Sequence, residues 1–315
     1  MKAVFFGTPA FAVPFLKSLI QDLDIEVVAV VTQPDKIRGR EKEPTPSPVK
    51  VLAQDHSIPV LQPASFKKDP DIHGTLERLG VDVFVVVAYG KILPAAVLAL
   101  PPLGAVNVHP SLLPRHRGPS PMQWAIAHGD VQTGITIMLL DEGMDTGPVL
   151  ASTAITLDGD ETYTSLQEKV HLFGPPLLVT TLKSYAEGKI VTVPQDDALA
   201  TMTHLLDKED GRVEWNHSME VIERKARAYE GWPGSWSMWK RTEGVQIRLK
   251  WIQMRFADFN ADVPPGTVVI NNNQLFVDAA DGTIEILEVQ PEGKPKMNAQ
   301  AFIQGYRDIH GAVLT

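Results

Sequence analysis

The chain has 315 residues, of which 44% are hydrophobic and 21% are charged, and its formal net charge at pH 7 is -9. This composition excludes a disordered or fibrous protein, and the absence of cysteine excludes disulfides, thiol nucleophiles and cysteine-built zinc sites. Because a net negative charge repels phosphate at long range, nucleic-acid binding would require local basic patches.

The N-terminal residues lack the basic and apolar regions of a secretory signal, and no stretch reaches the roughly 20 apolar residues of a membrane span. We therefore expect a cytoplasmic protein without a membrane segment. We also expect it to be a monomer. The nine histidines are scattered and show no metal-ligand spacing, so the sequence predicts no metal site.

The first part of the chain alternates short β-branched runs with helical stretches, which is typical of α/β folds. Buried strands are predicted at residues 3–6, 26–32, 81–88 and 105–109, and helices at 10–21, 49–55, 95–100 and 123–128. Two further strands, 134–140 and 149–156, precede a long predicted helix at 164–186. These elements predict a Rossmann-like domain with a mostly parallel sheet over residues 1–188.

The character of the sequence changes after Gly188. A polar segment containing Pro194 predicts a linker over residues 189–206. A helix is then predicted at 218–228, followed by short strands at 246–251, 267–270, 274–277 and 283–289. Short strands separated by turns predict a small β-barrel domain, OB-like in type, over residues 207–315.

Gly7 follows the first predicted strand, at the place where a dinucleotide-binding fingerprint would begin. The second and third glycines of that fingerprint are missing, so the backbone could not approach a pyrophosphate in the usual way. We therefore expect a tight strand-to-helix turn at Gly7 and no NAD binding.

Polar side chains occur at the end of one predicted central strand. Asn107 and His109 are two residues apart, so they share a face and lie about 7 Å apart along the strand. Open α/β sheets bind ligands at the carboxyl ends of their strands. Taken alone, however, this pair is more often a buried structural histidine with a turn asparagine. Asp145, in a glycine-containing loop, is by itself more often a turn former than a catalyst.

Several sequence blocks together resemble the methionyl-tRNA formyltransferase family over essentially the whole chain. The blocks are FGTP at 6–9, TQPD at 32–35, TPSPVK at 45–50, AYG at 88–90, NVHPSLLPR at 107–115 and LDEGMDTG at 140–147. The resemblance implies that Asn107, His109 and Asp145 occupy the family's catalytic positions. It also implies 10-formyltetrahydrofolate as the co-substrate and a C-terminal barrel of OB type that helps to hold tRNA.

The resemblance places folate-binding residues in the same blocks. They are Tyr89, Gly90, Ser111, Leu112, Leu113, Pro114, Leu140, Asp141, Glu142 and Gly143. Formyl transfer between nitrogens passes through a tetrahedral carbon with an oxyanion, to which Asn107 could donate a hydrogen bond. His109 could stabilise that oxygen as a cation, or accept the proton of the attacking amine when neutral. Asp145 could favour the imidazolium and pass a proton toward the folate nitrogen.

The formyl acceptor is less closely fixed, because related enzymes formylate glycinamide ribonucleotide or nucleotide-linked amino sugars. The ribonucleotide enzymes resemble only the first domain, whereas this chain has a second. A basic insertion after Pro34 resembles the family's tRNA-contacting loop. Its candidate contacts are Arg38, Arg40 and Lys42, of which Arg40 best matches the family's key arginine. Glu41, among other residues, makes this loop less basic than is usual in the family.

Further basic residues lie in the predicted barrel, where strand alternation places Arg248 and Lys250 on the face opposite apolar residues. These two are candidate phosphate contacts. Trp232, Trp236 and Trp239 could stack on bases, but such spacing is more often core or interface packing. We therefore expect initiator methionyl-tRNA as the acceptor. The alternatives are a nucleotide-amino-sugar formyltransferase and a non-catalytic RNA-binding protein.

Overall fold

The structure is a computed structural model that describes residues 1–37, 43–66, 69–241 and 244–315. The chain divides into two compact units. Unit 1 comprises Met1–Pro121, Gln132–Thr156 and Gln167–Thr203, and unit 2 comprises Met122–Val131, Leu157–Leu166 and His204–Thr315. Residues 189–203 of the expected linker therefore fall within unit 1. None of the helices in the described residues has the length and apolar character needed to cross a membrane.

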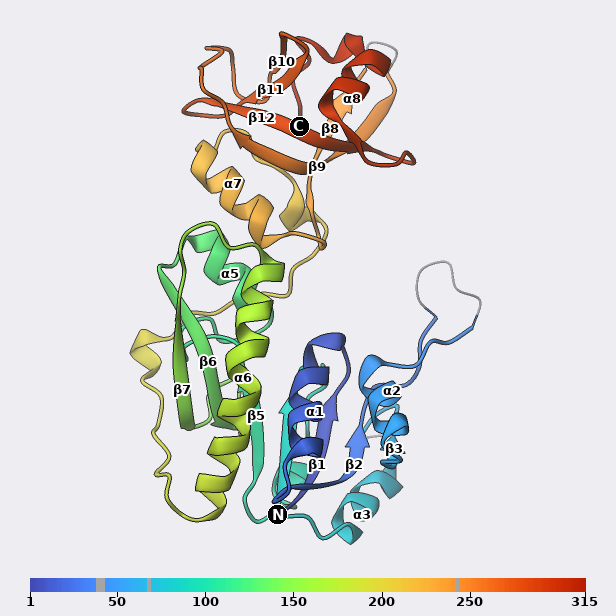
Figure 1. The fold of residues 1–315 in the computed structure, drawn as a ribbon, viewed down its shortest axis with the longest axis vertical. Helices are drawn as coiled ribbons and strands as arrows, with labels where there is room; N and C mark the ends of the chain where they lie inside the picture. Colours follow the sequence, from blue (N-terminus) through green and yellow to red (C-terminus); the bar gives the residue numbers. More distant parts are fainter. Residues whose placement is uncertain (38–42, 67–68, 242–243) are drawn as a thin grey trace. The chain divides into compact units, whose positions relative to one another are not determined.

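A central β-sheet organises unit 1 (Figure 1). In the described residues its strand order is β3-β2-β1-β4-β5-β6-β7. The strands are β1 (Lys2–Gly7), β2 (Glu26–Val31), β3 (Val60–Leu61), β4 (Val83–Val87), β5 (Ala105–His109), β6 (Gln132–Leu139) and β7 (Val149–Thr156). Strands β1 to β5 run parallel, and β6 is antiparallel to both β5 and β7. The prediction of a Rossmann-like, mostly parallel sheet is confirmed.

Helices connect these strands and cover the sheet. In chain order they are η1 (Ala10–Ala12), α1 (Val13–Gln21), α2 (Pro48–Asp55), α3 (Pro70–Arg78), α4 (Ala95–Leu98), α6 (Tyr163–Ala186) and η2 (Asp197–Leu199). Apart from Pro121, helix α5 (Pro121–His128) falls within unit 2, as does the first turn of α6. Ser47 caps α2, because its side chain accepts a hydrogen bond from the Lys50 backbone N–H, and Pro48 takes the first helical position. The sequence did not predict α3 and β3.

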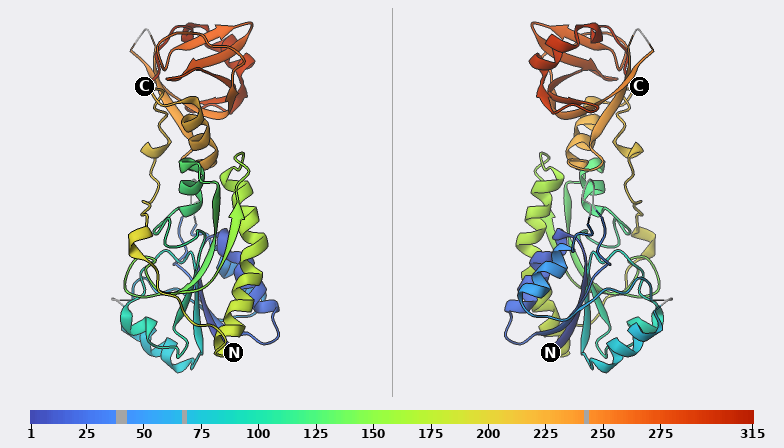
Figure 2. Two further views of the ribbon diagram at one scale, coloured as in Figure 1. Left: turned by 90° about the vertical axis from the view of Figure 1, so that its left-hand side faces the viewer. Right: turned by 90° about the vertical axis from the view of Figure 1, so that its right-hand side faces the viewer.

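The central strands β1, β4 and β5 are almost entirely buried because both faces of the sheet are covered, and this explains the apolar runs of β1 and β4. Val4 and Phe6 of β1 belong to a core cluster with Leu76 of α3 and Val97 of α4. On α1, the Phe15 ring lies 6.2 Å from the ring of His171 in α6. Figure 2 shows the helices in layers beside this sheet.

Gly7 at the end of β1 forms the expected tight turn. A Cβ atom at this position would lie 2.6 Å from the Phe5 ring and 3.0 Å from the carbonyl oxygen of Val87 in the neighbouring strand. Glycine therefore allows β1 to turn into η1 while it remains in contact with β4.

Unit 2 is built on a curled antiparallel sheet, visible in both views of Figure 2. Its strand order in the described residues is β10-β11-β12-β9-β8, and β13 pairs with β12. The elements are η3 (Glu209–Gly211), α7 (Met219–Ala228), β8 (Ser235–Lys240), β9 (Gln246–Phe256), β10 (Val268–Asn271), β11 (Gln274–Asp278), β12 (Thr283–Pro291), β13 (Met297–Asn298), α8 (Ala299–Gly305) and η4 (Arg307–Ile309). The prediction of an OB-like barrel is confirmed.

Tryptophans form much of the barrel core. Trp215 and Trp251 each donate an indole N–H to the buried Ser237 hydroxyl at 3.0 Å, so the polar atoms of three core side chains satisfy one another. Trp239 is also fully buried, whereas the Trp232 side chain is 59% exposed. Core packing therefore accounts for Trp239, and Trp232 lies on the surface.

Candidate active site

The end of β5 brings two polar side chains into a buried position. Asn107 pairs with Met138 of β6, and His109 pairs with Thr136, so both face the same side of the sheet. Asn107 is 9% exposed and His109 is 5% exposed. Among the described residues, none forms a hydrogen bond with the Asn107 carboxamide. The N–H groups of this carboxamide are therefore available to a ligand.

His109 is contacted at both ring nitrogens. Its Nε2 lies 2.9 Å from the carbonyl oxygen of His116, and its Nδ1 lies 3.5 Å from Oδ2 of Asp145. A carbonyl oxygen can only accept a hydrogen bond, so Nε2 carries the proton. Burial lowers the pKa of His109 below its usual value, and the opposing effect of the Asp145 carboxylate does not outweigh it. Neutral His109 therefore presents its lone pair at Nδ1.

Asp145 lies in the loop between β6 and β7, with a φ of 55° in the left-handed region. A non-glycine residue in this conformation stores strain of roughly 1–3 kcal/mol, so the surrounding contacts must hold it. Its Oδ2 accepts a hydrogen bond from the Gly118 backbone N–H at 2.8 Å. The structure thus brings together the three predicted catalytic residues Asn107, His109 and Asp145, although they are separated along the chain.

The loop that carries Asp145 runs along β5. At its start, the Leu140 N–H donates to the carbonyl oxygen of Ala105 at 2.7 Å, and further on Asp145 approaches His109 at the strand end. Gly147 lies near the end of the loop, and a Cβ atom at this position would clash with the Leu139 carbonyl, so the close approach requires glycine. The predicted folate residues 140–143 therefore lie on the same loop as Asp145.

Two comparisons show what the chain is similar to. The family model described as "Formyl transferase" matches residues 1–182, and "Formyl transferase, C-terminal domain" matches residues 205–307. A relative from Chloroflexus aurantiacus (strain ATCC 29366), named methionyl-tRNA formyltransferase, is 43% identical over 97% of each chain. One from Roseiflexus sp. (strain RS-1), with the same name, is 44% identical over 98% of this chain and 93% of its own. The chain belongs to the methionyl-tRNA formyltransferase family.

A comparison with solved structures supports the fold. HypX from Aquifex aeolicus, solved in complex with tetrahydrofolic acid, has a TM-score of 0.61 and 15% sequence identity. The match covers 97% of this chain and 47% of that one, so the chain spans about half the length of HypX. At this identity the likeness shows the fold alone. The family resemblance predicted from the sequence blocks is confirmed by the family models and the two relatives.

The other predicted folate residues follow β5 directly. Ser111 is fully buried, and its hydroxyl donates to the Arg115 carbonyl at 2.7 Å. Thr136 of β6 holds this loop, because its hydroxyl donates to the Ser111 carbonyl at 2.7 Å and accepts from the Leu113 N–H at 3.1 Å. Leu112 and Pro114 lie in the same loop. The sequence reasoning missed Thr136, which gave no signal because it occupies an ordinary strand position.

Tyr89 and Gly90, also predicted to bind folate, contact the loops after β1 and β2. The Tyr89 carbonyl accepts from the Gln33 carboxamide at 2.9 Å and from the Thr8 hydroxyl at 3.1 Å. The Tyr89 side chain is only 1% exposed, and its hydroxyl is buried without a hydrogen-bond partner. Burial raises its pKa to about 12. Tyr89 therefore forms hydrogen bonds to Gln33 and Thr8 through its backbone carbonyl and not through its hydroxyl.

A hollow of about 260 Å³ opens beside Thr8 and Gln33. Its described lining residues are Thr8, Gln33, Pro34, Lys36, Ile37, Thr45 and Ser47. The predicted tRNA-loop residues Arg38, Arg40 and Lys42 follow in the chain but lie outside the described residues.

The predicted barrel contacts Arg248 and Lys250 are half-buried residues of β9, on the opposite face from the core residues Leu249 and Trp251. The Arg248 guanidinium forms an ion pair with Glu292 at 3.2 Å. Other arginines of the same region pair likewise. These pairs are Arg224–Glu220, Arg227–Glu223, Arg241–Asp308 and Arg255–Glu285. The positive charges of these five arginines are therefore balanced by carboxylates of neighbouring helical turns, strands and loops.

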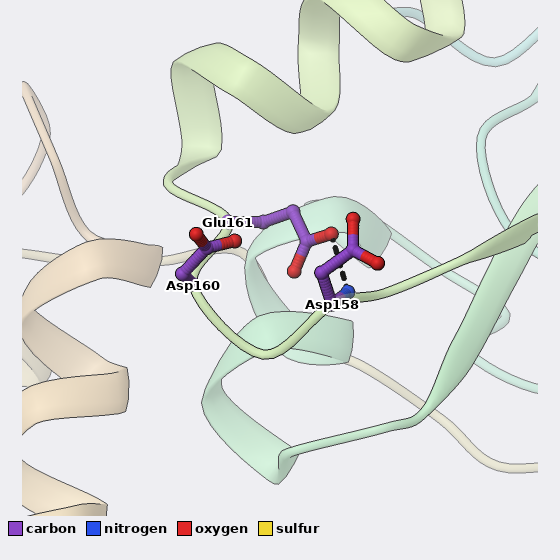
Figure 3. Close-up of side chains that lie close together, drawn as sticks. All are labelled: Asp158, Asp160 and Glu161. Carbon is purple, nitrogen blue, oxygen red and sulfur yellow. Dashed lines mark hydrogen bonds between the residues drawn. The ribbon is translucent and has the colours of Figure 1, made fainter.

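Carboxylates also gather in a loop of unit 2, where Asp158, Asp160 and Glu161 lie together (Figure 3). The Glu161 side chain is buried and accepts hydrogen bonds from the backbone N–H groups of Asp158 at 2.7 Å and Gly159 at 3.1 Å. These bonds replace water at the carboxylate, so its burial is explained by loop structure.

Proposed function

We propose that this protein transfers the formyl group of 10-formyltetrahydrofolate to the amino group of initiator methionyl-tRNA, giving N-formylmethionyl-tRNA. The observation that carries the proposal is the convergence of Asn107, His109 and Asp145 at the end of β5 in a chain of this family. The relatives' shared name supports the acceptor. The tetrahydrofolic acid complex of a protein with the same fold supports the folate.

We assign to Asn107 the role of stabilising the oxyanion. Attack of the amine on the formyl carbon produces a tetrahedral carbon whose oxygen becomes negative. The Asn107 carboxamide is buried, and no described residue forms a hydrogen bond with it, so it can donate to that oxygen without first breaking a bond within the protein. A donor fixed in advance in a site with little water stabilises the developing charge strongly.

We assign to His109 the role of accepting the proton of the attacking amine. Its Nε2 proton is committed to the His116 carbonyl, so Nδ1 is the atom that can accept. The lowered pKa of His109 keeps the ring neutral near pH 7, as a base must be before it accepts a proton. When Nδ1 is protonated, Asp145 Oδ2 lies 3.5 Å away and stabilises the imidazolium.

The leaving nitrogen of the folate requires a proton before it departs. His109 can return the proton that it took at Nδ1, and Asp145 can relay it because its Oδ2 faces that atom. The same pair thus acts first as base and then as acid. We place the folate between the 111–114 and 140–143 loops, because one follows β5 and the other continues to Asp145.

The acceptor is tested by offering each candidate acceptor to the protein on its own. Purified protein is incubated with 10-formyltetrahydrofolate and, separately, methionyl-tRNA, free methionine and an amino-sugar nucleotide, and the formylated products are measured. We expect transfer to methionyl-tRNA and little to free methionine, because remote tRNA contacts help to position the amine. Transfer only to the amino sugar would contradict the proposal, and RNA binding without any transfer would favour a binding protein.

The alanine variants of His109 and Asp145 serve as controls in this assay. Each should lose turnover while tRNA affinity, measured by filter binding, remains nearly unchanged, because these residues act on the reacting atoms. Equal loss of affinity would place them in tRNA binding instead.

A further inference from the structure

Residues 193–203, here named the strap, are tied to the active-site loops of unit 1. The backbones of Val193 and Val149 exchange two hydrogen bonds, at 2.8 and 2.9 Å. Further along, the Thr201 carbonyl accepts from the Arg117 N–H at 2.8 Å, and the Thr203 N–H donates to the Arg117 carbonyl at 2.8 Å. The strap therefore follows the loops that carry Asp145 and His116, although its composition resembles that of a linker.

One strap side chain, Gln195, bridges these two loops. Its Nε2 donates to the carbonyl oxygens of Asp145 at 2.8 Å and Gly147 at 2.7 Å. Its Oε1 accepts from Nε of Arg117 at 3.0 Å. Two carbonyls require a donor and a guanidinium requires an acceptor, so only one orientation of the carboxamide satisfies all three bonds. Glutamine is the residue whose side chain offers both groups at this reach.

The two bridged loops approach His109 from both sides. One loop supplies the His116 carbonyl at Nε2 of His109, and the other supplies the Asp145 carboxylate at Nδ1. Gly118, next to Arg117, donates its N–H to the same carboxylate. The separation of the loops therefore sets the distance between the Asp145 carboxylate and the imidazole, and Gln195 spans that separation.

The Asp145 backbone gives a second reason for this bridge. Its φ of 55° is an uncommon conformation for a residue with a side chain, so contacts must hold it in place. Gln195 binds the Asp145 carbonyl directly and the Gly147 carbonyl beyond it. Without these bonds the loop would relax and the carboxylate would move away from His109.

We infer that Gln195 is a positioning residue for formyl transfer, which holds the Asp145 carboxylate against His109 without touching the substrates. The inference rests on the proposed function for its kinetic consequence. Its structural consequence stands apart, because the geometry of Asp145 and His109 can be measured without substrate.

The test uses the full chain and the variant Gln195→Met, which keeps the length of the side chain and loses all three hydrogen bonds. We expect kcat to fall about 10–100-fold, as small misplacements of catalytic groups do, while the KM values for methionyl-tRNA and the folate stay within about twofold. Asp197→Asn is the matched control, because it weakens the ion pair between Arg117 and the exposed Asp197 side chain of the strap and leaves the Gln195 bonds intact. This control should keep wild-type kcat.

A second readout follows the His109 ring proton by NMR titration. Burial lowers the pKa of His109, whereas the Asp145 carboxylate and the hydrogen bond to the His116 carbonyl raise it. If the carboxylate moves away in Gln195→Met, the pKa of His109 falls further. A merely structural role would reduce the melting temperature and leave this titration unchanged.

Each outcome decides the inference. Wild-type kcat and titration in folded Gln195→Met would overturn it, and so would a lower kcat with an unchanged titration. If Gln195→Met does not fold, Gln195→Glu carries the same test, since its carboxylate still accepts from Arg117 but cannot donate to the two carbonyls. If the wild-type protein transfers no formyl group, the proposed function fails, while the titration still decides whether Gln195 positions Asp145.

Discussion

Nδ1 of His109 lies 3.5 Å from Oδ2 of Asp145, and the same carboxylate oxygen is held by the Gly118 N–H at 2.8 Å. Burial and this carboxylate act on His109 in opposite directions, and burial prevails, so the ring has a lowered pKa. The arrangement suits a group that must start neutral and become charged during the reaction. Asp145 stabilises the charged state without making it the resting state.

Replacing Asp145 with asparagine should preserve the loop and remove the charge. The carboxamide oxygen can still accept from Gly118, but it no longer stabilises the imidazolium, so we expect kcat to fall by about 10²-fold or more. Steady-state kinetics with methionyl-tRNA as the varied substrate measure this. Asp55→Asn, at an exposed position of α2, is the charge-matched control and should behave as the wild type.

The activity should fall at acidic pH through the ionisation of His109. Because the pKa of His109 is lowered from 6.5, the ring is neutral above that value, and kcat/KM should decline only as pH drops below it. A pH–rate profile from pH 5 to 8 measures this, and a decline centred well above 6.5 would contradict the assignment of neutral His109 as base.

Stability, like activity, should decrease as the pH becomes acidic. The pKa values of His109 and His171 are both lowered by burial, so the unfolded chain binds protons more readily than the folded one. The contribution of these two histidines to the free energy of unfolding should therefore be constant above about pH 6.5 and decrease as pH falls below it. Urea unfolding at several pH values measures the decrease. His171→Gln should make it smaller, and an unchanged decrease would mean that other groups cause it.

Strand β5 shows what local sequence can predict. Alternation along β5 placed Asn107 and His109 on one face, and the structure has them there, because a strand between two others has little freedom to depart from its period of two. The approach of Asp145 depends on the path of a loop. Spacing along the chain does not encode that path, so this residue was predicted only through the family resemblance.

Other features could not be read from the chain because their partners are distant. Gln195 is 50 residues from Asp145 and lies in a polar, proline-containing segment, which predicts a linker when its contacts are unknown. The basic region of the barrel gave a similar difficulty. The sequence predicted Arg248 as a free phosphate contact, whereas its partner Glu292 lies 44 residues away along the chain.

The Asn107→Ala variant should separate activity from stability. Loss of an oxyanion donor lowers kcat by about 10²–10³-fold, whereas the free energy of unfolding should change by less than about 1 kcal/mol, since no hydrogen bond within the described protein is lost. Val108→Ala is the control from the opposite face of β5. It should cost about 2 kcal/mol of stability and keep kcat. Equal effects of the two variants on kcat would argue against an oxyanion role.

Tyr89→Phe tests whether the hydroxyl contributes to stability or to folate binding. The hydroxyl is buried without a partner, and this raises its pKa to about 12. Removing it should leave the free energy of unfolding unchanged or raise it by roughly 1 kcal/mol, because an unsatisfied buried polar group is destabilising. The KM for 10-formyltetrahydrofolate should stay the same. A several-fold increase in that KM would show that the hydroxyl contacts the folate.

The barrel face at Arg248 and Lys250 can be tested through its salt dependence. Each phosphate contact that is lost should reduce the slope of log K against log salt concentration by about one unit, so Arg248→Gln and Lys250→Gln should each weaken methionyl-tRNA binding and flatten the slope. Glu292→Gln provides the opposite case. It releases Arg248 from its ion pair at 3.2 Å, so binding should become tighter at low salt. If all three variants bind tRNA with the wild-type slope, this face of β9 does not contact the tRNA backbone.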